Sequence, residues 1–245
     1  MKIFYNKKSM DGVAAAAIIY GEYGITSMMS EKDFIPFDSM GPAIPEDMMP
    51  EIIPDETCFF LDLKITQTIE IMKECVTKGC KVIHIDDQND KMYIDMLKQE
   101  PAEKISKITK FYNEDLSTTM LAWLYINFPG ELRENPMEVN YEFAPGYSHF
   151  VLNGDRLTTT RIPYGFRLIN DEKPKEFKET PAFIEGLLSI GNGIDENDPE
   201  EYNKYIAKFQ GDITPMSNIW GKIQNDDRKF MNTIIAKGER ELLRK

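Results

Sequence analysis

The first 130 residues alternate between short apolar runs and longer segments whose apolar residues recur at helical spacing. Strands are predicted at 2–5, 33–37, 57–63, 81–85 and 108–112. Helices are predicted between and after them, at 11–21, 66–78, 90–99 and 116–128. The run Cys58-Phe59-Phe60-Leu61 is apolar throughout, as in strands that are buried on both faces of a parallel sheet. Alternation at this spacing predicts an α/β fold with a doubly wound, mainly parallel sheet.

Beyond residue 130 the pattern changes. The stretch 137–166 is β-prone, and its Asn153-Gly154 pair favours a hairpin turn. Helical segments follow near 182–189, 199–209 and 213–244. We therefore predict an α/β core over 1–130, and over 131–245 the remainder of the same domain with a hairpin insertion and C-terminal helices. The last helix is apolar on one side only, which suits packing on the domain or on a second copy of the chain.

Composition and charge narrow the classes of function. The net charge of −12 argues against tight, sequence-independent binding to a long nucleic acid, because such binding relies on Lys and Arg. A small anionic ligand remains compatible with it, since a local pocket can be positive on an acidic protein. The longest plain apolar run, 13–20, is far shorter than the roughly 18 residues that a membrane span needs. Three cysteines without paired metal spacing predict reduced thiols in a cytoplasmic protein.

Carboxylates follow three of the predicted strands. Asp11 follows the first strand, Asp62 ends the third, and Asp86 and Asp87 follow the fourth. Ligands of doubly wound sheets bind at the carboxyl ends of the strands, so we expect these side chains to converge. Like charges packed together resist ionisation unless a cation lies between them, and Mg²⁺ or Mn²⁺ suits oxygen ligands. Any one of them could instead be a helix cap or a turn residue, as Asp11 could be for the helix that follows it.

Five segments carry motifs in a fixed order along the chain. They are the run 4–19 with Asp11-Gly12, the strand end Phe60-Leu61-Asp62, the run 82–88 with Asp86-Asp87-Gln88, the helix 116–123, and the stretch 167–183 with Asp171. Their order and spacing resemble the DHH superfamily of phosphoesterases over most of the chain. The resemblance implies that family's fold, and hydrolysis of phosphoesters or phosphoanhydrides by two metal ions that share a bridging water.

Two of the motifs depart from the family's pattern. The first motif of the family reads His-x-Asp-x-Asp-Gly, where this chain has Lys7, Ser9 and Asp11; the third reads Asp-His-His, where it has Asp86-Asp87-Gln88. One of the two ions depends on the missing His and Asp of the first motif. The resemblance therefore implies one Mg²⁺ or Mn²⁺, or none if the site is fully degenerate. The metal ligands that it implies are Asp11, Asp62, Asp86, Asp87 and Asp171, and Asp62 and Asp87 would also take the catalytic roles in an active enzyme.

The candidates for substrate binding lie beside these carboxylates and in the second half of the chain. The ammonium of Lys7 would neutralise carboxylates and attract a phosphate, but it has no open coordination position with which to polarise water. Ser9 stands next to it, and Gln88 replaces a His that the family places beside the substrate phosphate. Arg161 and Arg167 are candidates for anion contacts. Lys7 could equally be a solvated loop residue.

Three hypotheses follow. The first is a catalytically impaired DHH-like protein that binds a phosphorylated small molecule or nucleotide, as would suit a viral or accessory protein that sequesters a nucleotide signal. The second is an active phosphoesterase or phosphohydrolase that uses one carboxylate-bound Mg²⁺ or Mn²⁺. The third is a protein-interaction module on a DHH scaffold that self-associates through its C-terminal helices. Family members usually carry a further C-terminal substrate-binding domain, and this chain stops at Lys245, so we expect half of the usual substrate cleft to be absent.

Overall fold

The structure is a computed structural model. It describes residues 1–6, 9–23, 29, 33–37, 50–63, 65–87, 108–112, 116–127, 148–151, 164–169, 178–190, 222–223, 225 and 227–244. The strands are β1 (Lys2–Asn6), β2 (Phe34–Phe37), β3 (Thr57–Leu61), β4 (Lys81–Asp86), β5 (Ile108–Tyr112) and β6 (Ser148–Val151). The helices are α1 (Met10–Tyr23), α2 (Ile65–Thr77), α5 (Thr118–Asn127), α7 (Tyr164–Leu168), α8 (Thr180–Ile190) and α11 (Arg228–Leu242).

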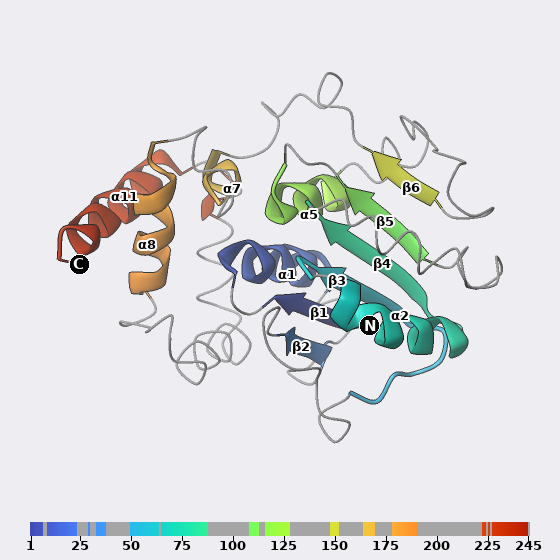
Figure 1. Ribbon diagram of the computed structural model, residues 1–245. Coiled ribbons are helices and arrows are strands. Elements are labelled where there is room, and N and C mark those ends of the chain that lie inside the picture. The colour runs from blue at the N-terminus through green and yellow to red at the C-terminus, as the bar shows by residue number, and fades with distance from the viewer. Residues whose placement is uncertain are drawn as a thin grey trace.

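The strands form one six-stranded sheet in the order β2-β1-β3-β4-β5-β6 (Figure 1). Every neighbouring pair is parallel, which confirms the predicted α/β class and parallel sheet. The connection from β1 to β2 runs to one side of β1, whereas the connections from β3 onward run to the other side. The direction of winding therefore reverses between β1 and β3. In doubly wound sheets ligands bind outside the carboxyl ends of the strands at such a reversal.

Helices cover both faces of the sheet. Helices α1 and α5 lie side by side on one face, and α2 lies on the other (Figure 1). The core beneath α1 and α5 includes a row of register neighbours that crosses four strands, namely Tyr5, Leu61, Ile85 and Phe111. On the α2 face, the ring of Phe4 stacks on that of Phe60 with a centroid distance of 4.5 Å. Both faces of the central strands are thus buried, as their apolar runs predict.

The start of α1 is fixed by two local features. The Ser9 hydroxyl oxygen accepts hydrogen bonds from the backbone N–H of Asp11 at 3.1 Å and of Gly12 at 3.3 Å, which makes Ser9 the N-cap. A Cβ at Gly12 would lie 2.6 Å from the carbonyl oxygen of Asn6. Only glycine therefore allows the first turn of α1 to lie against the end of β1. This close approach places Asp11 beside the carboxyl edge of the sheet.

The second half of the chain adds one strand and three helices to the described structure. Strand β6 pairs in parallel with β5, and the predicted hairpin turn at Asn153-Gly154 lies outside the described residues, as do the helices expected at 90–99 and 199–209. The helix expected at 213–244 is not continuous. It is interrupted before α11, whose N-cap is Asp227 in an extended conformation.

The two C-terminal helices α8 and α11 pack closely. A Cβ at Gly186 would collide with the carbonyl oxygen of Ile234, and one at Gly238 would collide with that of Ala182. The backbones of the two helices thus meet with no room for a side chain between them. No helix in the described part of the chain is long and apolar enough to cross a membrane.

Candidate metal centre at the carboxyl edge of the sheet

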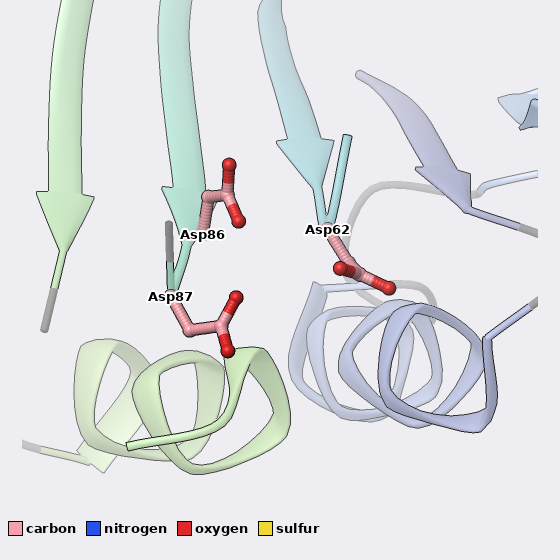
Figure 2. Close-up of side chains that lie close together, drawn as sticks. All are labelled: Asp62, Asp86 and Asp87. Carbon is pink, nitrogen blue, oxygen red and sulfur yellow. The ribbon is translucent and has the colours of Figure 1, made fainter. Parts of the chain in front are cut away.

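Three carboxylates meet where β3 and β4 end. One oxygen each of Asp62, Asp86 and Asp87 lies within 4.8 Å of the other two (Figure 2). Strand register produces this meeting, because Leu61 pairs with Ile85 and the next residues along the two strands are Asp62 and Asp86. We call these three residues the aspartate cluster. The strand-end pattern predicted that they converge, and their role as metal ligands remains a prediction.

The backbone at Asp62 turns sharply out of the sheet. Its φ of 52° lies in the left-handed region, which L-residues other than Asn and Asp seldom adopt. Its N–H nevertheless donates to the carbonyl oxygen of Ile85 at 3.1 Å, so the turn stays attached to β4. This combination holds the Asp62 side chain over α1 while its N–H stays hydrogen-bonded to β4 (Figure 2).

The side chains of the aspartate cluster lie on both faces of the sheet. Consecutive residues of a strand point to opposite faces, and in Figure 2 Asp87 points toward α5 whereas Asp86 points away from it. Asp86 and Asp87 are 3% and 7% exposed, and Asp62 is partly exposed. A ligand would therefore approach from the side of Asp62, with the other two carboxylates behind it.

Burial and neighbouring charge raise the pKa of the Asp62 carboxyl well above its ordinary value. Burial contributes most, followed by the negative charge of Asp11, with smaller contributions from Asp86 and Asp87. A hydrogen bond with the Ser9 side chain acts in the opposite direction. The side-chain amide of Asn6 also donates to Asp62 Oδ2 at 3.2 Å. A bound divalent cation would remove the repulsion that raises this pKa.

Asp11 takes a different position from the one predicted. Its Oδ2 accepts from the backbone N–H of Thr118 at 2.8 Å, and its Oδ1 accepts from that of Thr119 at 2.7 Å. The Thr119 hydroxyl returns a hydrogen bond to the Asp11 carbonyl at 3.1 Å. Asp11 therefore caps the positive end of α5, and it lies beside the aspartate cluster without belonging to it. The sequence suggested a capping role only for the helix that contains Asp11.

His84 lies in β4 and is fully buried. Its Nε2 lies 3.3 Å from the carbonyl oxygen of Leu63 and 3.6 Å from Asp86 Oδ2. A carbonyl oxygen only accepts, so the hydrogen bond to Leu63 places a proton on Nε2. His84 thereby ties the chain after β3 to β4, directly behind Asp86.

The other predicted site residues divide into two sets. Ser9, predicted to bind substrate, is occupied as the N-cap of α1 and as a neighbour of Asp62. Arg167 lies in α7 and is partly exposed. This helix begins within the stretch 137–166, which was predicted to be β-prone. The remaining predicted residues lie outside the described part of the chain: Lys7, Gln88, Arg161 and Asp171.

Comparison with protein-family models, with curated proteins and with solved structures finds no match to this chain. The DHH-like identity therefore remains a prediction from the motifs. What the site can do has to be argued from its own geometry, which offers three crowded carboxylates, one of them partly exposed, next to the reversal point of a parallel sheet.

Proposed function

We propose that this protein binds one Mg²⁺ or Mn²⁺ through the aspartate cluster and, through that ion, the phosphate of a small molecule such as a nucleotide. The observation that carries the proposal is the meeting of Asp62, Asp86 and Asp87 within 4.8 Å. The cluster also lies next to the reversal of winding between β1 and β3, where ligands of doubly wound sheets bind.

The electrostatics favour an ion as the first ligand. Three carboxylates of which two are almost fully buried repel one another, and burial with charge crowding raises the pKa of Asp62. Hard divalent ions take carboxylate oxygens and keep further positions for water or phosphate oxygens. An ion held in this way turns an acidic edge into a site for an anion, which agrees with phosphate binding by a chain of net charge −12.

The same residues argue against a two-metal centre. Two-metal hydrolysis places the ions about 3.5–4 Å apart and needs ligands for both. Asp11 directs both carboxylate oxygens to α5, and Ser9 stands as a helix cap where the family's first motif has an Asp. We therefore propose binding with impaired turnover.

Slow hydrolysis through a single ion is the second candidate. It is favoured by the partial exposure of Asp62, because a carboxylate that a ligand can approach can also accept a proton from a water molecule beside the ion. In that case Asp62 would act as the base toward a metal-bound water, and Asp87 would hold the ion. The two candidates share the cation and differ in whether product is released.

The test begins with the cation alone. Titration with Mn²⁺ or Mg²⁺ should raise the melting temperature of the wild type in a saturable way, since a ligand that binds only the folded state stabilises it. Asp86→Asn should abolish this rise. Asp227→Asn is the matched control, because Asp227 caps α11 away from the cluster and Asn caps equally well. A wild type that millimolar Mn²⁺ leaves unchanged would contradict the proposal.

The second step adds phosphorylated molecules. Calorimetry with nucleoside mono-, di- and triphosphates should show binding that requires Mn²⁺ and is lost in Asp86→Asn. Release of phosphate or mononucleotide is measured in parallel. Steady release that Asp62→Ala abolishes would replace impaired turnover with the hydrolase candidate.

A further inference from the structure

Two polar side chains from the segment between β1 and α1 hold the carboxylate of Asp62. Asn6, the last residue of β1, donates from Nδ2 to Asp62 Oδ2 at 3.2 Å. The side chain of Ser9, the N-cap of α1, makes a second hydrogen bond with Asp62. The partly exposed member of the aspartate cluster is therefore held from the side of β1, while Asp86 and Asp87 lie at the end of β4 on the other side of β3.

The direction of both hydrogen bonds follows from the groups that make them. The hydroxyl oxygen of Ser9 uses its two lone pairs, because it accepts from the backbone N–H of Asp11 at 3.1 Å and of Gly12 at 3.3 Å. Its O–H is the group that remains for Asp62, and the amide nitrogen of Asn6 can only donate. Both contacts therefore require a carboxylate that accepts, as the ionised form of Asp62 does.

Strand pairing and helix packing fix the position of these donors. Tyr5 of β1 pairs with Leu61 of β3. The next residues along the chain, Asn6 and Asp62, are therefore neighbours at the carboxyl edge of the sheet. A Cβ at Gly12 would lie 2.6 Å from the carbonyl oxygen of Asn6 and 3.0 Å from its Cβ, so the first turn of α1 packs directly on Asn6, which is 8% exposed. The fold thus holds the donors in place without any ligand.

We propose that Asn6 and Ser9 are positioning residues that hold Asp62 as a preformed ligand for the divalent ion. This inference rests on the proposed function for its consequence. Carboxylates that bind metals are themselves hydrogen-bonded by neighbouring groups, and these partners orient the ligand toward the ion. An ionised carboxylate offers about four lone-pair positions, and the two donors use two of them, so positions remain for the ion. Asn6 and Ser9 act through Asp62 and do not contact the ion.

The first experiment measures Mn²⁺ affinity by calorimetry. Asn6→Leu, which keeps a similar shape without the amide, should bind Mn²⁺ at least about tenfold more weakly than the wild type, because such partners of metal ligands contribute that much to affinity. Ser9→Ala should also weaken Mn²⁺ binding. Ser9→Thr keeps both the O–H and the helix cap, so it should bind as the wild type does. Unchanged or tighter Mn²⁺ binding in either Asn6→Leu or Ser9→Ala would overturn the inference.

Two variants control for a general loss of stability. Asn127, at the C-terminal end of α5, is also an asparagine that donates from Nδ2, to the carbonyl oxygen of Trp123 at 2.8 Å. Asp227 caps α11 as Ser9 caps α1. Asn127→Leu and Asp227→Ala should therefore leave the Mn²⁺ affinity unchanged. A loss of affinity in these controls as large as that in Asn6→Leu and Ser9→Ala would overturn the inference.

The second experiment needs no metal and separates this inference from the proposed function. In EDTA, urea unfolding of Asn6→Leu, Asp62→Ala and the double variant should show coupling, because Asn6→Leu costs less stability once its partner Asp62 is gone. Coupling in a protein that binds no Mn²⁺ would confirm that Asn6 holds Asp62 and would contradict the metal site. Absence of coupling would overturn the inference whatever the Mn²⁺ affinity is.

A third comparison covers the case in which Asn6→Leu does not fold. Ser9 is partly exposed at the start of a helix, where substitutions are tolerated better than in the core. Ser9→Ala should then bind Mn²⁺ more weakly than Ser9→Thr does, because only Ser9→Thr keeps the O–H that reaches Asp62. Equal Mn²⁺ affinity in these two variants would overturn the inference.

Discussion

The carboxylate of Asp11 and the backbone N–H of Thr118 are joined at 2.8 Å across 107 residues of sequence. This contact attaches the first turn of α1 to the first turn of α5, the two helices that cover one face of the sheet. It also supplies a negative charge to the positive end of α5. The carboxyl edge of the sheet is therefore bordered by the first turns of two helices. Backbone N–H groups in both turns already donate hydrogen bonds to side chains of the protein, namely Ser9 for α1 and Asp11 for α5.

The first prediction concerns this cap. Asp11→Ala should lower the free energy of unfolding by about 2–3 kcal/mol, because it removes charge-assisted hydrogen bonds to two buried N–H groups. Asp227→Ala, which removes an ordinary local cap from α11, should cost only about 1 kcal/mol. Urea denaturation measures both. An equal loss of unfolding free energy in the two variants would mean that the contact between α1 and α5 stabilises the protein no more than an ordinary helix cap does.

The second prediction separates capping from metal binding at the same residue. Asp11→Asn should destabilise the protein yet keep the rise in melting temperature that Mn²⁺ produces, since Asp11 lies outside the aspartate cluster. Asp62→Asn should lose that rise. Thermal melts of both variants with and without Mn²⁺ measure this effect. If Asp11→Asn also lost the rise in melting temperature, Asp11 would be a metal ligand.

The third prediction uses two glycines of α1. Gly12→Ala should destabilise the protein by about 2 kcal/mol or more, because the new Cβ would lie 2.6 Å from the Asn6 carbonyl oxygen. Gly21→Ala should stabilise it by up to about 1 kcal/mol, since nothing lies within 4 Å of its Cβ and alanine favours the helix. Chemical denaturation compares the two. Similar effects at both positions would contradict the close approach of α1 to β1.

The fourth prediction concerns pH. Because the pKa of Asp62 is higher in the folded than in the unfolded state, the folded state binds more protons between these two values. The contribution of Asp62 to stability therefore falls as pH rises from about 4 toward the raised pKa. Asp62→Asn should flatten this fall in metal-free buffer. Urea unfolding across the acidic and neutral range measures the slope, and an unchanged slope in the variant would assign the effect elsewhere.

The fifth prediction concerns the three cysteines, which are free and buried where β3 and β4 start and α2 ends. Burial raises the pKa of Cys80 to about 11, and a hydrogen bond with Cys75, together with burial, raises the pKa of Cys58. Since the thiolate is the reactive form, Ellman's reagent at pH 8 should react slowly with the native protein and label all three thiols in denaturant. Rapid labelling of the native protein would show that this end of the core opens.

The sequence alone determined the class of fold and the position of the aspartate cluster. The apolar runs of β3 and β4 predict strands that are buried on both faces. Because strands and helices alternate along the chain, these strands are expected to be parallel. Once strands are parallel, the residues that follow them share one edge. This is why the convergence of Asp62, Asp86 and Asp87 was predictable from local pattern.

Only the tertiary structure decided what each charged residue at this edge does. Whether Asp11 faces a metal or the N–H of Thr118 depends on how α1 packs against α5, and no local signal spans 107 residues. Local propensity and spacing specify elements and their edges, whereas the partner of a side chain is set by long-range packing, which brings together groups that the sequence keeps far apart.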